Sequence, residues 1–377
     1  MKNLRMKSII TGGFAWFVLS TFGCTSSAAI EKPTSFEINK GVNIGNWLSE
    51  SPLRGERRAR IFTNDDVEKL ASYGFDHLRL PIDEDHLFNS SGKVDEETLA
   101  HIHETITNCK KNEMRVVLDL HSTKSHTFKS SKISGNTLWH SKEAQKQIVR
   151  IWKIILDEFE KYSEHLLAYE ILNEPTAEKD EQWNYIANLV IKTIREVNKE
   201  RVIVLGSNRW NYVGKIENLD VPSNDLNIIL SFHFYEPLLL THYEASFNKF
   251  ANLKMPQKVK YPGRLFSDSV YNSLSAKDQV LVKPYRRDYN KKYFLERWKP
   301  AIDFAAQKGL KLYLGEFGCL PNAGDNTRLA WLKDVVSLCR EYNIAYSLWE
   351  YNNVFGFAEM GTGKIRDGEM VRILTKY

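Results

Sequence analysis

The stretch "EAQKQIVRIWKIILDEF" (residues 143–159), followed closely by "LLAYEIL" (residues 166–172), decides the fold of the chain. In the first segment apolar residues recur every three or four positions, which is typical of an amphipathic helix. The second segment is a short apolar run, which is typical of a buried strand. It ends at Asn173-Glu174-Pro175, an amide, a carboxyl group and a proline. The two segments predict a helix that leads into a buried strand with polar groups at its end.

The same alternation of patterns extends along the chain. Short apolar runs rich in Val, Ile and Leu lie at residues 41–45, 75–80, 115–120, 166–172, 202–206, 227–234, 310–315 and 344–349. Amphipathic helical patterns lie between most of them, at residues 65–73, 95–111, 142–162, 180–199, 292–308 and 326–342. Strands that alternate with helices form parallel sheets. Eight such units within about 330 residues predict an α/β fold, a single (β/α)8 TIM barrel over residues 36–377.

An open, doubly wound sheet is the alternative α/β arrangement. Such sheets carry a glycine-rich turn after their first strand, which holds phosphate groups. The sequence contains no turn of this kind, and it therefore favours the closed barrel.

The connection after the sixth predicted strand is unusually long. Residues 236–291, rich in Tyr, Phe, Lys and Pro, separate that strand from the next helical pattern. Connections of this length are commonly functional. Because loops after barrel strands surround the active site, we expect this insertion to contact the substrate.

Two carboxyl groups follow strands that lie on opposite sides of the predicted barrel. Glu174 ends the fourth strand and Glu316 ends the seventh. Catalytic groups of such barrels lie at the carboxyl ends of the strands. Two carboxyl groups about 5–5.5 Å apart are what glycoside hydrolysis by double displacement requires. One must be protonated to release the leaving oxygen and the other ionised to attack the anomeric carbon, so their surroundings must separate their pKa values.

Two neighbours of Glu174 have an expected structural role. Pro175 removes a backbone donor and is expected to push Glu174 towards extended backbone geometry, which ends the strand there. Asn173 offers both a donor and an acceptor next to the carboxyl group.

Seven short segments occur in order at the spacing of barrel strands: "GVNIGNWL", "FDHLRLPI", "VVLDLH", "ILNEP", "SFHFYEP", "LYLGEFG" and "YSLWEY". Together they resemble the motifs of glycoside hydrolase family five, the cellulase-type retaining glycosidases. The resemblance covers residues 36–377. It implies that Glu174 is the acid/base, that Glu316 is the nucleophile and that Asn173 holds the 2-hydroxyl of the sugar.

The resemblance also implies roles for five further residues. Arg79 and Tyr235 would hydrogen-bond the nucleophile and keep it ionised. His121 and His233 would border the subsite of the reacting sugar, and Trp349 would form its apolar platform.

Two residues after the first strand and one after the last complete the candidate set. Asn46 and Trp47 either line a neighbouring subsite or belong to the packing. Glu350 is expected to be structural, because the side chains of consecutive strand residues point in opposite directions.

The sequence thus predicts a retaining β-glycosidase that acts on a polysaccharide or oligosaccharide, with an endo-β-1,4-glucanase favoured. β-Mannanase, xyloglucanase and exo-β-1,3-glucanase activities on the same scaffold are the alternatives. An alternative of another class is a non-catalytic, surface glycan-binding lipoprotein, which would not need both carboxyl groups. We expect no cofactor, no metal and a monomer.

Charge and cysteine content exclude other classes of protein. The formal net charge is +5, of which the first 23 residues contribute three, so the rest of the chain is too weakly basic for nucleic-acid binding. Of the four cysteines, Cys24 belongs to the N-terminal segment described below. The remaining three, Cys109, Cys319 and Cys339, are an odd number, which excludes a complete disulfide framework. Cys109 and Cys339 are expected to be buried in helices.

The N-terminus predicts export. Lys2, Arg5 and Lys7 precede an apolar run that ends near residue 22, as in a signal peptide over residues 1–23. The segment "TFGC" resembles a bacterial lipobox, which would place a lipid on Cys24 and attach the protein to a membrane through a tether over residues 24–35. Cleavage near residues 26–28 is the alternative. The protein is then an outer-membrane or cell-surface lipoprotein in the first case, and periplasmic or secreted in the second.

Overall fold

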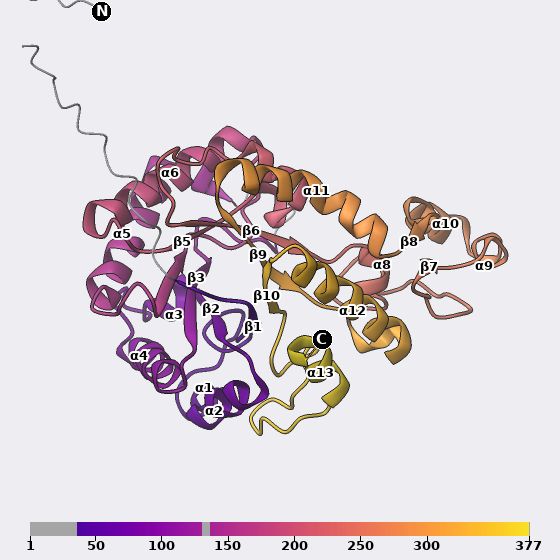
Figure 1. Cartoon of the computed structure of the whole chain (residues 1–377), viewed down its shortest axis with the longest axis horizontal. Coiled ribbons are helices and arrows are strands. Elements are labelled where there is room, and N and C mark those ends of the chain that lie inside the picture. The colour runs from indigo at the N-terminus through magenta and orange to yellow at the C-terminus, as the bar shows by residue number, and fades with distance from the viewer. Residues whose placement is uncertain (1–35, 130–135, 377) are drawn as a thin grey trace, which may run out of the picture. The chain divides into compact units, whose positions relative to one another are not determined.

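The computed structural model describes residues 36–129 and 136–376. Eight parallel strands close into a barrel in the order β1-β10-β9-β6-β5-β4-β3-β2 (Figure 1). Their bounds are β1 Lys40–Asn43, β2 His77–Asp83, β3 Arg115–Ser122, β4 Leu167–Glu170, β5 Ile203–Gly206, β6 Ile228–Phe234, β9 Lys311–Phe317 and β10 Ala345–Leu348. The predicted (β/α)8 barrel is confirmed, and each predicted strand run overlaps an observed strand.

Long helices cover the outside of the barrel (Figure 1). They are α2 Asn64–Tyr73, α4 Glu96–Lys111, α5 Lys142–Phe159, α6 Asp180–Val197, α11 Lys291–Lys308, α12 Asp325–Glu341 and α13 Gly368–Lys376. Short helical turns are α1 Glu56–Ala59, α3 Glu84–Leu87 and α7 Asn208–Asn211. Among the described helices, none combines the length and the apolar character that crossing a bilayer requires.

Helix α5 illustrates how the sequence places the end of β4. The helix begins after Ser141, whose hydroxyl accepts a hydrogen bond from the backbone of Ala144. Its apolar face buries Ile148, Ile151, Trp152 and Ile155. The Trp152 indole donates to the backbone carbonyl of Ile171, 3.1 Å away. The amphipathic helix therefore holds the segment that leads directly to Glu174.

The barrel interior changes from apolar to charged along its axis. At the amino ends of the strands, one apolar cluster contains Val117, Ala168, Val204, Ile229 and Tyr313, together with Phe36 and Ile38. Alternation puts Asp119 and His121 on the same face of β3 as Val117, and Glu170 on the same face of β4 as Ala168. Inward-facing residues thus become polar towards the carboxyl ends, where we expect the active site.

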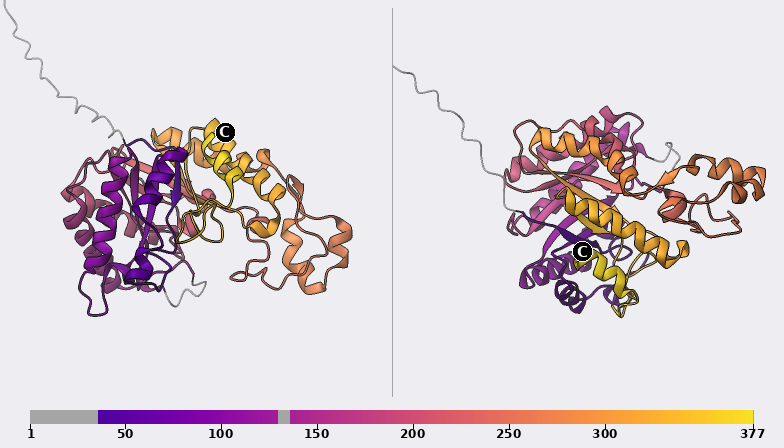
Figure 2. Two further views of the ribbon diagram at one scale, coloured as in Figure 1. Left: turned by 90° about the horizontal axis from the view of Figure 1, so that it is seen from below. Right: turned by 45° about the vertical axis from the view of Figure 1, so that its right-hand side comes forward.

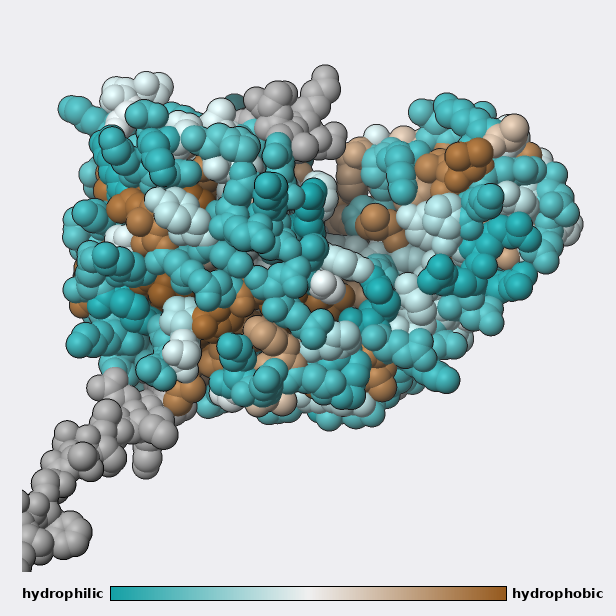
Figure 3. Space-filling view, turned by 90° about the horizontal axis from the view of Figure 1, so that it is seen from above, coloured by the Kyte–Doolittle hydropathy of each residue, from teal (hydrophilic) through white to brown (hydrophobic). Residues whose placement is uncertain are grey.

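The long insertion after β6 is a small subdomain rather than an irregular loop. It contains α8 Leu238–Thr241, β7 Gly263–Arg264, α9 Asp268–Ser273, α10 Ala276–Val282 and β8 Asp288–Tyr289. Helix α8 lies against the barrel, where the backbone of Leu320 donates to the carbonyl of Thr241. The other four elements project from one side of the barrel (Figure 2), and a hollow lies between this projection and the barrel surface (Figure 3). The insertion predicted from the sequence is therefore present at the predicted place.

Cys109, Cys319 and Cys339 are buried and free. Burial raises the pKa of all three thiols, which is consistent with inert, structural cysteines. The predicted signal peptide, Cys24 and the tether lie outside the described residues.

Candidate active site

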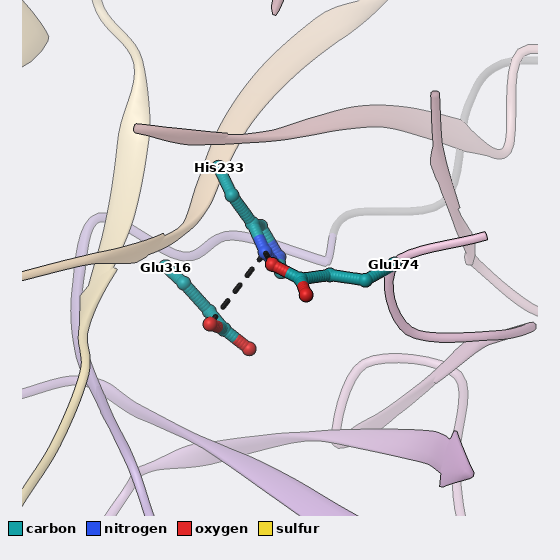
Figure 4. A group of neighbouring side chains, drawn as sticks. All are labelled: Glu174, His233 and Glu316. Carbon is teal, nitrogen blue, oxygen red and sulfur yellow. Dashed lines mark hydrogen bonds and ion pairs between the residues drawn. The ribbon is translucent and has the colours of Figure 1, made fainter. Parts of the chain in front are cut away.

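Glu174 and Glu316 meet at the carboxyl ends of the strands. Glu316 lies within β9, and Glu174 follows the extended residues after β4. A carboxylate oxygen of Glu174, one of Glu316 and a ring nitrogen of His233 all lie within 4.8 Å of one another (Figure 4). The side chains of Glu174 and Glu316 are 12% and 6% exposed. The structure thus brings together two nearly buried carboxyl groups from distant parts of the sequence.

Arg79 on β2 binds one of these two carboxyl groups directly. Its guanidinium is fully buried and donates to Glu316 Oε1 at 2.8 Å. It also donates to Glu170 Oε2 at 2.6 Å and pairs with Asp119 Oδ2 at 3.0 Å. Further bonds reach the side-chain oxygens of two amides, those of Asn43 and Asn173. Sequence reasoning identified Arg79 but missed the roles of Asn43, Asp119 and Glu170 as its partners.

The pKa values of both carboxyl groups are raised, but their surroundings act on them differently. Burial raises the pKa of Glu174 well above its usual value, and the charge of Glu316 raises it further. Burial also raises the pKa of Glu316, but Arg79 and the hydroxyl of Tyr235 oppose this. Tyr235 donates to Glu316 Oε2 at 3.0 Å. Among the described residues, Glu316 has a buried cation in contact and Glu174 has none, so Glu174 holds a proton more readily than Glu316 does.

His233 on β6 lies between the two carboxyl groups. Its Nδ1 is 2.9 Å from Glu174 Oε1 and 3.5 Å from Glu316 Oε2. Asn211 Nδ2 is 3.2 Å from Nε2 and donates to it. Burial, with the charges of Arg79 and His121, lowers the pKa of His233 well below its usual value. The ring is therefore neutral, and its Nδ1–H donates to Glu174 Oε1.

His121 and Trp349 form a stacked aromatic pair at the edge of the site. Their ring centres are 5.5 Å apart and the planes are inclined by only 4°. Asp119 Oδ2 accepts from His121 Nδ1 at 2.7 Å. Burial lowers the pKa of His121, but the bond to Asp119 and its charge outweigh burial and leave the pKa raised. Phe128 packs edge-on against the other side of the imidazole.

Asn173 has one free donor. Its Oδ1 accepts from Arg79 Nη2 at 2.8 Å, which fixes the orientation of the amide. Its Nδ2 is buried and has no hydrogen-bond partner among the described residues. A buried donor of this kind is suited to an acceptor on a bound ligand.

The expected backbone geometry of Glu174 is wrong. The residue has φ 43°, in the left-handed region, rather than the extended geometry that Pro175 was expected to impose. The physical reason is tertiary structure: residues of neighbouring loops donate hydrogen bonds to the backbone carbonyls of both Glu174 and Pro175. Left-handed backbone at a non-glycine residue is strained and is concentrated at functional sites.

Asn46 and Trp47, although adjacent in the chain, have different surroundings in the structure. Trp47 is 2% exposed, and its indole donates to the backbone carbonyl of Arg58 within the core. A subsite role for Trp47 is therefore wrong, because its ring is covered by the core. Asn46 is half-buried and donates to Glu350 Oε2 at 2.7 Å. Burial raises the pKa of Glu350 to about 8, and its Oε1 has no partner among the described residues.

A row of aromatic rings extends from Tyr235 into the insertion, and sequence reasoning missed it. Ring centres of Tyr235 and His242 are 5.2 Å apart, and those of His242 and Phe247 are 5.9 Å apart. Phe355 contacts both Tyr235 and His242. Phe247 is 64% exposed, a large value for an aromatic residue. The richness of residues 236–291 in Tyr and Phe was the signal that could have found it.

Glu174, His233 and Glu316 form the one group of described residues that could hold a metal ion. Carboxylate oxygen and imidazole nitrogen are suitable ligands for several divalent metals. The nearby guanidinium of Arg79, 2.8 Å from Glu316, opposes a cation there. Each carboxyl group instead has its own hydrogen-bond donors: His233 for Glu174, and Arg79 and Tyr235 for Glu316.

Comparison with known proteins identifies the family. Residues 41–354 match the family described as Cellulase (glycosyl hydrolase family 5). The chain is 32% identical to Endoglucanase C of Acetivibrio thermocellus over 83% of this chain and 91% of that protein. It is 28% identical to Cellodextrinase A of Ruminococcus flavefaciens over 90% and 94%. A solved endoglucanase structure superimposes with a TM-score of 0.69 at 26% identity, covering 90% and 97% of the two chains. The chain is a glycosidase and belongs to glycosyl hydrolase family 5, the cellulase family.

Proposed function

We propose that the protein is a retaining endo-β-1,4-glucanase in which Glu174 is the acid/base and Glu316 the nucleophile. The observation that carries this proposal is the distance between the two carboxyl groups, whose oxygens lie within 4.8 Å. Retaining enzymes have carboxyl groups about 5–5.5 Å apart, whereas inverting enzymes need about 6.5–9.5 Å to admit a water molecule.

The acid role of Glu174 is supported by its electrostatic environment. The carboxyl group is nearly buried, faces Glu316 and has no Lys or Arg ion pair among the described residues, and its pKa lies well above the usual value. In the first step the protonated Glu174 gives its proton to the glycosidic oxygen. In the second step the resulting carboxylate removes a proton from the attacking water.

The nucleophile role of Glu316 is supported by its two hydrogen-bond donors. Arg79 binds Oε1 and Tyr235 binds Oε2, which stabilises the ionised form. The carboxylate attacks the anomeric carbon as the bond to the leaving oxygen breaks, and a covalent glycosyl-enzyme forms. Water then releases the sugar with the original β configuration.

Other residues are assigned to binding of the reacting sugar. The free Nδ2 of Asn173 donates to the 2-hydroxyl, a bond that strengthens as positive charge develops at the ring. Trp349, backed by His121, offers an indole surface to the apolar face of the sugar. His233 orients the carboxyl group of Glu174.

Replacing Glu174 by glutamine is expected to remove proton donation without changing the shape of the site. We expect kcat/KM on cello-oligosaccharides to fall roughly 10³-fold, because an alcohol leaving group needs a proton. On dinitrophenyl cellobioside, whose leaving group needs none, kcat/KM is expected to change less than threefold. Steady-state kinetics on both substrates measures the difference. Equal losses on the two substrates would contradict the assigned role.

The choice of substrate rests on the relatives and on the aromatic row beside the site. The relatives compared above are named endoglucanase and cellodextrinase, which favours β-1,4-linked glucan. We infer that the aromatic row from Tyr235 to the exposed Phe247 contacts sugars beyond the reacting one. β-Mannan, xyloglucan and β-1,3-glucan are the competing substrates. A product profile on defined oligosaccharides of all four types decides among them, and internal cleavage of cellohexaose is expected.

A non-catalytic glycan-binding protein is the competing class. It would bind these oligosaccharides without releasing reducing ends, and Glu316→Ala would behave as the wild type does. The network around Arg79 argues against this class, because binding alone does not require a buried cation on one of two adjacent carboxyl groups.

We also propose that the protein is exported and carries a lipid on Cys24. The support is the sequence alone: Lys2, Arg5 and Lys7 precede an apolar run that ends near residue 22, and Cys24 follows it. Metabolic labelling with radioactive palmitate is expected to label the wild type and to leave Cys24→Ala unlabelled. Export with no label on the wild type would favour the cleaved, freely secreted form.

A further inference from the structure

The segment after β4 is hydrogen-bonded by residues of two neighbouring loops. The segment after β3 (residues 123–129 and 136) supplies His126, whose Nε2 is 3.2 Å from the backbone carbonyl of Glu174. The segment after β5 supplies Trp210, whose backbone N–H donates to the carbonyl of Pro175 at 3.1 Å. Asn136 Nδ2 donates to the hydroxyl of Thr176 at 2.8 Å. Three consecutive residues beginning at Glu174 are therefore each fixed from outside.

Burial, ring packing and backbone pairing hold His126 in place for this contact. It is 1% exposed, its ring packs on Trp139 with centres 5.2 Å apart, and its backbone pairs with Thr123 in both directions. A carbonyl oxygen can only accept, so Nε2 must carry the hydrogen and donate to Glu174. Its Nδ1 is buried without a partner among the described residues. Nothing else in these contacts explains a histidine rather than an apolar ring at this position.

The contact acts on a strained residue. Glu174 has φ 43° and is not glycine, a conformation that persists only where surrounding contacts impose it. At the other end of the same residue, the carboxyl group is held by His233. The two histidines therefore hold Glu174 at its backbone and at its side chain, and together they determine where its proton points.

We propose that His126 is a positioning residue for acid/base catalysis: its Nε2–H holds the carbonyl of Glu174 and so aims the carboxyl group at the leaving oxygen. This inference rests on the proposed function of Glu174 as the acid. It predicts that loss of the donor impairs proton delivery specifically, while binding and nucleophilic attack continue. The signature is a dependence of the defect on the leaving group, which a general loss of stability would not produce.

The test compares kcat/KM on cellotetraose with kcat/KM on dinitrophenyl cellobioside. His126→Phe keeps a ring of similar size and removes the donor. We expect its kcat/KM to fall roughly 10- to 100-fold on cellotetraose, because small misplacements of reacting groups cost about this much. On the dinitrophenyl substrate less than a threefold change is expected. His126→Gln, which keeps an N–H at a similar reach, is expected to restore most of the lost activity.

The controls separate this inference from the proposed function. Glu174→Gln is measured on the same two substrates, and equal losses there would overturn the proposed function itself. A second outcome is that the loss of activity in Glu174→Gln depends on the leaving group while His126→Phe loses both activities equally, or loses neither. In that case only the role of His126 is overturned.

His103→Phe is the matched control. It removes a half-buried histidine that pairs with Glu158 on the helix surface, and it should leave both activities unchanged. If His126→Phe does not fold, His126→Leu replaces it. If neither folds, a cellotetraose defect in His126→Gln equal to that of Glu174→Gln would overturn the proposal.

Discussion

Replacing Glu316 by alanine is expected to reduce kcat/KM on both cello-oligosaccharides and dinitrophenyl cellobioside by roughly 10⁴-fold or more. The reason is that a good leaving group does not replace the atom that attacks the anomeric carbon. This distinguishes Glu316 from Glu174, whose replacement spares the activated substrate. Release of reducing ends and of dinitrophenol measures the two losses.

Glu316→Ala also leaves room for a small external nucleophile. Azide is expected to enter beside Arg79 and Tyr235, attack the anomeric carbon of the activated β-glycoside and displace dinitrophenolate, which gives an α-glycosyl azide. Glu84→Ala is the matched control, because Glu84 is also buried and accepts from the backbone of Lys124 at 2.8 Å, outside the site. It should lose stability and retain activity. A β-glycosyl azide from Glu316→Ala would contradict the nucleophile assignment.

Replacing Arg79 by methionine is expected to destabilise the fold by about 3–5 kcal/mol at pH 7, because it leaves buried carboxylates without their cation. The three affected groups are Asp119, Glu170 and Glu316. Burial already raises the pKa of Glu170 to about 7 with Arg79 present. Without Arg79 the folded-state pKa of Glu170 and Glu316 should rise further. Chemical denaturation at several pH values measures the free energy of unfolding.

The pH dependence of the Arg79→Met defect has a defined sign. A carboxyl group whose folded-state pKa lies above its unfolded value binds more protons when folded, so stability increases as pH falls. The defect should therefore shrink from pH 7 to pH 5. Arg201→Met is the matched control, since Arg201 is also fully buried but pairs with Glu160 away from the active site. Both variants should be unstable, but only Arg79→Met should alter the pH profile of kcat/KM. A defect of constant size across this pH range would contradict the account of the network.

Most of the fold could be predicted because the periodicity of the sequence reflects burial on one side of a helix and on both sides of a strand. Strand β3 and helix α5 begin at the predicted residues. Helix α13 was missed because it follows a stretch of turns with no apolar strand before it. The short elements of the insertion were missed for a similar reason: helices such as α9 span too few residues to show a period.

The two catalytic candidates could be predicted because each lies at the end of an apolar run. Glu174 and Glu316 stand out for this reason, whereas Arg79 lies inside β2 and was identified through the family resemblance. Glu170 does not stand out, since a charged residue inside an apolar run has no local sign of its partner, which lies 91 positions earlier in the chain. The left-handed backbone of Glu174 was also beyond prediction, because contacts from distant loops override the local preference set by Pro175.

Trp47 shows a further limit of prediction from the sequence, because a candidate site residue lies in the core. The sequence left open whether Trp47, next to Asn46 after β1, lines a subsite or belongs to the packing, because side chains of adjacent residues point in different directions. The Trp47 ring packs against Phe62 and His101 in the core, whereas Asn46 faces Glu350. Which of two neighbours faces a site depends on the local backbone, here the positive φ of Asn46.

The most direct test of the central claim is to trap the covalent intermediate. A 2-deoxy-2-fluoro cellobioside with a dinitrophenyl leaving group reacts in the first step but is released slowly, because fluorine destabilises the positively charged transition states of both steps. After denaturation and proteolysis, mass spectrometry should find the fluorinated sugar on the peptide that contains Glu316, with the label absent from Glu316→Ala. A sugar attached to the peptide of Glu174 instead, or rapid turnover of the unfluorinated substrate to an α product with no adduct, would contradict it.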